Sequence, residues 1–204
     1  MLALLLILKW LPSMSRAMTP GQHKQYLGML SNPNAQRWLH MIKYAEGVDK
    51  KDNPYGTAFT GKQFDNSQPH PGTAYTSSSG YTSSAHGAYQ WMPDTWQEIY
   101  GENKPMTQEN QDAAALFKIK QRGVDPTSEV SRESLNKLSP EWASLPKLNG
   151  LSYYNQPVKS HSELVQVWSQ YKPKPEPVKA KSNPVASGKP QLSIQPKEEY
   201  WATP

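Results

Sequence analysis

Apolar positions recur with helical spacing most clearly between residues 34 and 48. One face of this stretch collects the residues Trp38, Leu39, Met41, Ile42 and Ala45. Such a stripe predicts an amphipathic helix with one buried face. Asn34, which follows a proline, is the expected N-cap, and Gly47 is the expected C-terminal stop.

The expected helix places a carboxylate, Glu46, in its last turn. The carbonyl end of a helix carries partial negative charge, and apolar neighbours desolvate an ionised carboxylate, so both effects raise the pKa of Glu46. A carboxylic acid that stays protonated near neutral pH can act as the general acid in glycoside cleavage. The alternative is a solvated residue at a frayed helix end, because structural carboxylates far outnumber catalytic ones.

Weaker periodicity predicts further helices along the chain. Their expected ranges are 19–30, a stretch beginning near residue 94, 107–122, 128–138 and 139–145. Thr19 and Thr107 are the expected N-caps of the first and the third. A last helix carries Leu164 and Trp168, and either Ser160 or Ser162 can cap it.

Residues 49–82 lack long apolar periodicity and are rich in Gly, Pro, Ser, Thr, Asn and Tyr. A stretch of this length without helices is uncommon unless it forms small strands or functional loops. We therefore expect a short, irregular β-hairpin around residues 58–60 and 63–64. Helices surrounding one small β region indicate an α+β fold.

The N-terminal residues 2–8 form an apolar run that Lys9 interrupts and Pro12 closes. The run is far shorter than the ~20 residues that span a bilayer. Positive charge follows the run rather than preceding it, unlike in a signal peptide. Three interpretations stay open: a helix that docks on a partner protein, a weak membrane-associating segment, or an atypical export signal. We favour docking, since an exposed apolar run needs a cover.

The composition changes after Tyr171. The remaining residues hold seven of the nineteen prolines and little apolar periodicity, which predicts an extended, polyproline-II-like tail. The aromatic pair Tyr200-Trp201 near its end could anchor the tail in a partner's groove. A tail without a partner is the alternative.

The net charge of the chain is +5, and six lysines against three glutamates in the tail supply +3 of it. The remaining charge of about +2 is too small to indicate a nucleic-acid partner. The absence of Cys excludes disulfides and thiolate metal sites, and the five His are scattered, so we expect no metal and no cofactor. Seven Trp and eleven Tyr suit carbohydrate stacking, although they serve cores equally well.

Short motifs follow one another between residues 36 and 171. They are Ala45-Glu46-Gly47, Phe64-Asp65, His70-Pro71, Ser83-Ser84, Gly87-Ala88-Tyr89-Gln90, Thr95-Trp96, Gln111-Asp112-Ala113, Ile119-Lys120-Gln121-Arg122-Gly123 and Trp142-Ala143-Ser144-Leu145-Pro146, with Tyr154 and Gln156 behind them. In order and spacing these motifs resemble the lambda-type endolysins. That family comprises phage lytic transglycosylases that act on bacterial peptidoglycan.

The resemblance implies an α+β, lysozyme-like fold in which a helical lobe and a small irregular β lobe flank a cleft. It covers neither end of the chain. The expected organisation is therefore an N-terminal docking extension at 1–30, a peptidoglycan-cleaving domain at 31–171 and a Pro/Lys-rich extended tail at 172–204. Both extensions are expected to be non-globular.

By the resemblance, Glu46 is the catalytic acid that protonates the oxygen between N-acetylmuramic acid and N-acetylglucosamine. The muramoyl hydroxymethyl oxygen then attacks the anomeric carbon and leaves an anhydromuramoyl end. The alternative enzyme is a hydrolytic muramidase, which needs a second carboxylate. Asp49, Asp52 and Asp65 are the candidates for that carboxylate.

The resemblance also implies substrate-binding residues. Gln90 matches a glutamine that lines the cleft and can hydrogen-bond an acetamido group; a structural bond to the loop backbone is the alternative. Tyr89, beside it, is a further candidate. Tyr89 and Trp91 flank Gln90 with alternate facing, so we expect one of the two to pack in the core.

Tyr154 matches a family tyrosine on a loop over the cleft. Several inserted residues before it make Tyr153 a competitor for this role. His86 could contact sugar, although a loop histidine more commonly faces solvent. His70, before a proline, is expected to support the β lobe rather than the chemistry.

The implied partners are peptidoglycan glycan strands, with phage structural proteins as possible partners of the two ends. The enzyme would act on the cell wall in the periplasm, either after release from the host cytoplasm at lysis or carried in the virion. A different class is a virion structural protein whose lysozyme-like domain penetrates the wall at infection. A wall-binding module without catalysis is a third possibility.

Overall fold

The computed structural model describes residues 17–154 and 157–175. Its helices are α1 (Pro20–Gly28), α2 (Pro33–Ala45), α3 (Pro93–Tyr100), α4 (Gln108–Gln121), α5 (Arg132–Leu138) and α6 (His161–Gln170). Single 3₁₀ turns are η1 (Met29–Ser31), η2 (Pro54–Gly56) and η3 (Phe59–Gly61), and β1 (Tyr75–Thr76) pairs antiparallel with β2 (Thr82–Ser83). Among these residues, no helix has the length and apolar character that crossing a membrane requires.

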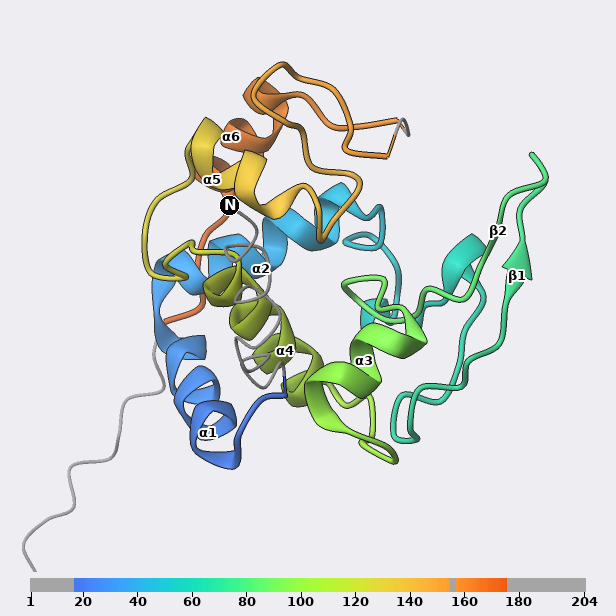
Figure 1. Ribbon diagram of the computed structural model, residues 1–204. Helices are drawn as coiled ribbons and strands as arrows, with labels where there is room; N and C mark the ends of the chain where they lie inside the picture. Colours follow the sequence, from blue (N-terminus) through green and yellow to red (C-terminus); the bar gives the residue numbers. More distant parts are fainter. Residues whose placement is uncertain (1–16, 155–156, 176–204) are drawn as a thin grey trace, which may run out of the picture.

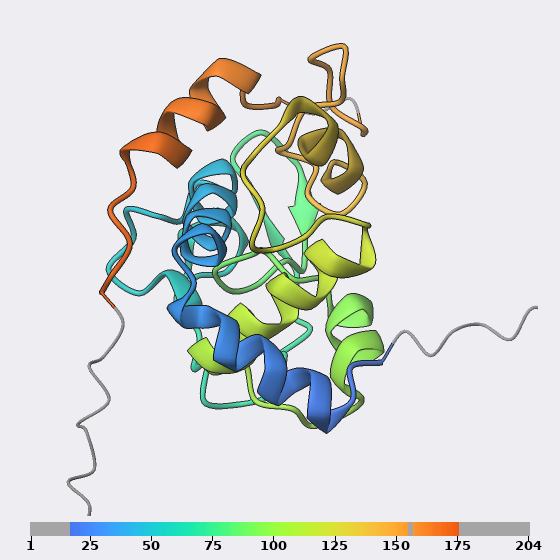
Figure 2. The same ribbon diagram turned by 90° about the vertical axis from the view of Figure 1, so that its left-hand side faces the viewer.

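Helix α4 lies at the centre of the molecule, with α1 on one side and α3 on the other (Figure 1). Its residues 110–119 are all buried, because neighbouring elements cover every face of the helix. Thr107 caps it as predicted by accepting a hydrogen bond from the N–H of Asn110. Figure 2 shows α1 beside α4 at one end and α6 beside α2 at the other.

Helix α2 carries the predicted apolar face, and all five residues of that face are buried. Its N-cap is Asn32 rather than Asn34. The Asn32 side chain accepts hydrogen bonds from the N–H groups of Asn34 and Ala35, while Pro33 occupies the first helical position. Trp38 on this face meets Trp168 of α6 edge-on at 4.8 Å between ring centroids, so α6 covers α2.

The β lobe differs from the prediction in where its hairpin lies. The strands pair Tyr75 with Ser83, farther along the chain than expected. The stretch expected to form the hairpin instead makes the turn η3, with an isolated bridge between Thr57 and Gln63. Thr60 and Gly61 both have positive φ there, which closes a turn too tight for paired strands.

Two other predictions need correction. The helix expected at 128–138 begins only at Arg132, and residues 139–145 form turns instead of a helix. Pro140 has no N–H to donate, and the N–H groups of Glu141 and Trp142 both bond the carbonyl of Leu138. For the last helix, the structure selects Ser160 over Ser162 as the N-cap.

The segment before α2 contributes to the core. Met18 and Tyr26 are buried in the same apolar cluster as α2 and α4, and the N–H of Met18 donates to the carbonyl of Ile99. Residues 17–30 therefore pack against the helices of the domain. The apolar run at 2–8 and the aromatic pair near the C-terminus lie outside the described residues.

Candidate active site

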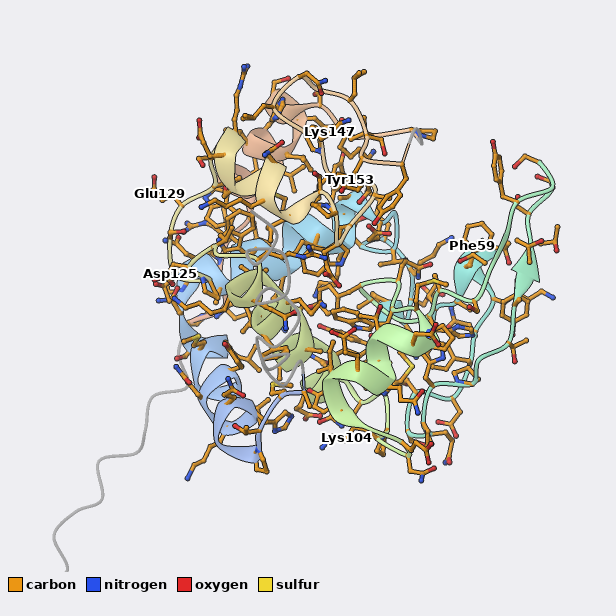
Figure 3. The ribbon with its side chains drawn as sticks, in the orientation of Figure 1. Phe59, Lys104, Asp125, Glu129, Lys147 and Tyr153 are labelled. Atoms are coloured by element: carbon orange, nitrogen blue, oxygen red, sulfur yellow. The ribbon has the colours of Figure 1, made fainter. Side chains whose placement is uncertain are left out.

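A cleft of about 1410 Å³ lies between the β lobe and the helical lobe. Its walls come from the end of α2, the β1–β2 hairpin, helices α3 and α4, and the segment 140–143. In Figure 3, Phe59 marks the β side and Tyr153 the opposite side. The lining residues with polar or aromatic side chains include Glu46, Phe59, Tyr81, Gln90, Glu98, Lys118, Arg122, Glu141, Trp142 and Tyr154.

Glu46 forms the C-cap of α2, and its half-buried side chain lines the cleft. Burial disfavours the ionised carboxylate and raises the pKa of Glu46 to about 7. The hydroxyl of Ser144 donates a 2.6 Å hydrogen bond to Glu46 Oε1 and opposes this rise. The result is a carboxyl group that holds a proton at neutral pH yet can release it, as general acid and base catalysis require.

Gln90 also lines the cleft, and its backbone adopts φ of 49°, which is unusual for a residue with a side chain. Its amide Nε2 donates to the carbonyls of Gly87, at 2.9 Å, and Thr57, at 3.3 Å. The loop is fixed at Gly87, where φ is 82° and an added Cβ would lie 2.2 Å from Oε1 of Gln111. Gln90 therefore makes the structural hydrogen bonds to the loop backbone that were the alternative to sugar binding. It also lines the cleft.

Tyr154 lines the cleft, whereas its competitor Tyr153 does not. The Tyr154 hydroxyl donates to the carbonyl of Pro140 at 2.9 Å, and the rest of its ring stays open, with 54% of the residue exposed. Tyr153 packs edge-on against it at 5.0 Å between centroids. The two tyrosines therefore form one aromatic surface with Tyr154 on the cleft side.

The structure corrects the prediction for Tyr89. Its side chain is only 1% exposed, and its hydroxyl donates to Asp112 in the interior of the molecule. Trp91 is also buried, against Trp96 and Trp142. Both aromatic residues beside Gln90 are therefore core residues, whereas one of the two was expected there.

His86 likewise lies away from the cleft lining, and its side chain is completely buried. Its Nδ1 donates to the carbonyl of Ser84 at 2.8 Å, and its ring packs among Phe64, His70 and Tyr75. Burial lowers the pKa of His86, which favours the neutral ring. His86 therefore supports the β lobe and does not contact sugar in this arrangement.

His70 occupies the supporting position predicted for it. Its Nδ1 accepts from the N–H of Gly72, so its Nε2 carries the proton and donates to the carbonyl of Trp91 at 2.9 Å. The two histidine rings meet at 4.8 Å between centroids. Packed rings thus give the β lobe the rigidity that its two-residue strands cannot supply.

The sequence does not predict Ser144 as a partner of Glu46 or a role for the other charged residues of the cleft. Lys118 of α4 and Arg122, the C-cap of this helix, both form ion pairs with Oε2 of Glu141, at 3.2 and 2.8 Å. Arg122 belongs to a motif already noted, yet nothing in the sequence pairs it with Glu141. Only the fold brings α4 to the segment after α5.

The three candidates for the second carboxylate of a muramidase, Asp49, Asp52 and Asp65, are not among the residues that line the cleft. Asp65 instead accepts hydrogen bonds from Ser67, which hold its pKa below the usual range. The carboxylates that do line the cleft beside Glu46 are Glu98 and Glu141. Within the described residues, no group of His, Asp and Glu side chains could hold a metal ion.

Comparison with known proteins places this geometry in a family. The sequence model of the Endolysin family matches residues 36–174. The chain belongs to the endolysin family. The endolysin of Escherichia phage lambda is 29% identical to it over 125 residues, which cover 56% of this chain and 78% of the lambda protein. Membership of this family confirms the prediction of a phage enzyme that degrades peptidoglycan, namely a lysozyme-like glycosidase.

Two solved structures share the fold of this endolysin. Bacteriophage lambda lysozyme complexed with a chitohexasaccharide aligns with a TM-score of 0.58 and 26% identity over 68% of this chain and 93% of that one. A second lysozyme from bacteriophage lambda gives a TM-score of 0.54 and 24% identity over 68% and 91%. The predicted α+β, lysozyme-like fold is therefore confirmed. The division of the endolysin at residues 30/31 and 171/172 stays a prediction.

Proposed function

We propose that this endolysin cleaves the β-1,4 bond between N-acetylmuramic acid and N-acetylglucosamine as a lytic transglycosylase, with Glu46 as its acid and base. The observation that supports this most directly is the position of Glu46. It is a carboxyl group in the wall of a large cleft, with a pKa raised to about 7 by burial. The lambda lysozyme that shares this fold was solved with a chitohexasaccharide, a glycan oligomer.

In the proposed reaction Glu46 first donates its proton to the glycosidic oxygen, and the bond from that oxygen to the muramoyl anomeric carbon breaks. The hydroxymethyl oxygen of the same muramoyl residue attacks the anomeric carbon. The Glu46 carboxylate takes the proton that this hydroxyl loses, so the enzyme returns to its starting state. The products are an anhydromuramoyl end and a free N-acetylglucosamine end, and no water is consumed.

Gln90 and Tyr154 are the proposed substrate contacts. Because the amide nitrogen of Gln90 already donates to backbone carbonyls, its Oε1 is the atom left to accept a hydrogen bond from an acetamido N–H. Tyr154 offers an exposed aromatic ring at the opposite wall for a sugar face. Both groups are held in place before substrate arrives, which lowers the entropic cost of binding.

Digestion of purified peptidoglycan tests the proposal, with mass spectrometry of the released muropeptides. Glu46→Gln keeps the shape of the side chain but removes the proton, so cleavage should fall at least about 100-fold. Glu129→Gln is the matched control, since Glu129 is exposed and distant from the cleft (Figure 3). It should cleave at the wild-type rate.

Product masses decide the reaction type. Products one water lighter than hydrolysed muropeptides, lost in Glu46→Gln, are the expected result. Hydrated products would make the enzyme a muramidase and direct attention to Glu98 and Glu141. Equal cleavage by the wild type and Glu46→Gln would reject Glu46 as the acid.

The site and stage of action are part of the same proposal. We propose action on the wall in the periplasm, with the two ends of the chain as contacts for phage structural proteins. Residues 1–16 and 176–204, on which this association depends, lie outside the described structure. Immunodetection in purified virions and in lysates separates carriage in the particle from release at lysis.

A further inference from the structure

The wall of the cleft contains a charge cluster of three residues, Lys118, Glu141 and Arg122. Both cations pair with the same carboxylate oxygen, Oε2 of Glu141. Two positive charges and one negative charge leave the cluster with one net positive charge. Lys118 and Glu141 expose only 6% and 7% of their side chains. These two buried charges balance each other, so the excess positive charge is that of Arg122, which lines the cleft and can pair with an anionic ligand.

Arg122 is the member of the charge cluster that a ligand can reach. Its side chain is 36% exposed and lines the cleft. Its Nε and Nη2 donate to Glu141 at 3.0 and 2.8 Å. A guanidinium has five N–H groups, so three are not engaged by Glu141. Since Lys118 alone could neutralise Glu141, the second cation points to a role beyond holding the segment in place.

The charge cluster lies close to the proposed acid. Glu141 is three residues before Ser144, whose hydroxyl bonds Glu46. Three peptide units separate their Cα atoms by at most about 11 Å. Arg122 and Glu46 line the same cleft, so an anion bound by Arg122 would belong to the same glycan strand that Glu46 meets.

We propose that the charge cluster binds a carboxylate of the peptide that the muramoyl residue carries, so that the enzyme prefers peptide-bearing, ionised glycan strands. The inference rests on the proposed function, because that reaction seats a muramoyl residue beside Glu46. The muramoyl lactyl group bears a peptide with free carboxylates, whereas the sugar rings of the strand are neutral. Arg is well suited to this partner, because its planar N–H groups match a carboxylate.

The test compares two substrates that differ only in charge. Soluble peptidoglycan strands are used as prepared or after conversion of their peptide carboxylates to amides with carbodiimide and ammonia. For the wild type, kcat/KM should be about tenfold higher on the ionised strands, the size expected for one charge-assisted hydrogen bond. In Arg122→Gln this ratio should fall toward one.

Two further variants control for charge and folding. Lys120→Gln removes a cation from the exposed face of α4, outside the cleft lining, and should keep the wild-type ratio. Arg122→Lys keeps the positive charge and should retain part of the preference. Thermal unfolding of each variant checks that the protein is still folded, so that a change in the ratio cannot come from a loss of structure.

Binding separates failure of this inference from failure of the proposed function. The variant Glu46→Gln should bind fluorescently labelled ionised strands about tenfold more tightly than amidated strands. Adding Arg122→Gln to this variant should remove the difference. That measurement stands even if the wild type cleaves neither strand. The inference would be overturned by a ratio near one both for cleavage by the wild type and for binding by Glu46→Gln, or by a ratio that Arg122→Gln leaves unchanged.

Discussion

At the scale of single residues, the hydroxyl of Ser144 lowers the pKa of Glu46 and so shifts the pH at which its proton is lost. Its 2.6 Å hydrogen bond stabilises the ionised carboxylate, while burial raises the pKa of Glu46 to about 7. Two opposing effects therefore set the pH at which the acid loses its proton, and the smaller one depends on a single hydroxyl.

Ser144→Ala is expected to raise the pKa of Glu46 further, because only the desolvating effect of burial remains. Activity should then persist to higher pH, with the alkaline limb of the kcat/KM profile displaced upward. The measurement is the pH dependence of glycan-strand cleavage between about pH 5 and pH 9. An alkaline limb that stays in place or moves to lower pH would show that Ser144 does not bond the carboxylate in solution.

Whether a site residue could be predicted from the sequence depends on how far along the chain its contacting residues lie. Glu46 could be singled out, because its position at the end of an amphipathic helix is a local sequence signal. Ser144 could not, since 98 residues separate it from Glu46. His86 was misplaced for a related reason: its small sequence neighbours Ala85 and Gly87 suggest a surface loop, whereas the rings that bury it come from other segments.

At the scale of elements, those with local sequence signals could also be predicted, whereas those fixed by distant contacts could not. Helices α2 and α4 could be predicted from local signals, namely apolar residues and a terminal glycine, together with the Thr107 N-cap for α4; only the N-cap of α2 was misplaced, by two residues. The β-hairpin could not be, because its strands are two residues long and carry no usable alternation. Its location is set by packed rings and isolated bridges between distant segments.

Ser160 and Ser162 offer a matched test of one helix terminus. Ser160 accepts a hydrogen bond from the N–H of Glu163 at 3.2 Å, whereas Ser162 is exposed and bonds only the Ser160 hydroxyl. Ser160→Ala should lower the free energy of unfolding by about 1 kcal/mol, because a backbone N–H of α6 loses its partner. Ser162→Ala should change it by less than about 0.5 kcal/mol. Denaturant unfolding measures both; equal effects would contradict the assigned cap.

The stability of the whole molecule depends on the ionisation of Glu46. Its folded pKa of about 7 exceeds its ordinary value of 4.5, so the folded state holds a proton that the unfolded chain has already released between these pH values. This contribution to stability is fully present below about pH 4.5 and is lost as pH rises through about 7.

Glu46→Gln should therefore stabilise the protein at alkaline pH while it removes activity. The variant and the wild type should unfold alike near pH 4. Above pH 7 the variant should be more stable by up to about 3 kcal/mol, since each pKa unit corresponds to about 1.4 kcal/mol. Chemical unfolding at pH 4 and pH 9 measures the two differences. A difference that does not depend on pH would show that Glu46 is not desolvated in the folded state.

The central position of α4 has a consequence for synthesis of the chain on the ribosome. Tyr26 packs against Phe117 of α4, and the hydroxyl of Tyr55 bonds Asp112, so the first half of the chain completes its packing only against residues 108–121. The apolar face of α2 also needs α6, which packs on it through Trp168 and emerges later still. The nascent chain should therefore stay sensitive to proteases until both α4 and α6 have left the exit tunnel, and then fold as one unit rather than lobe by lobe.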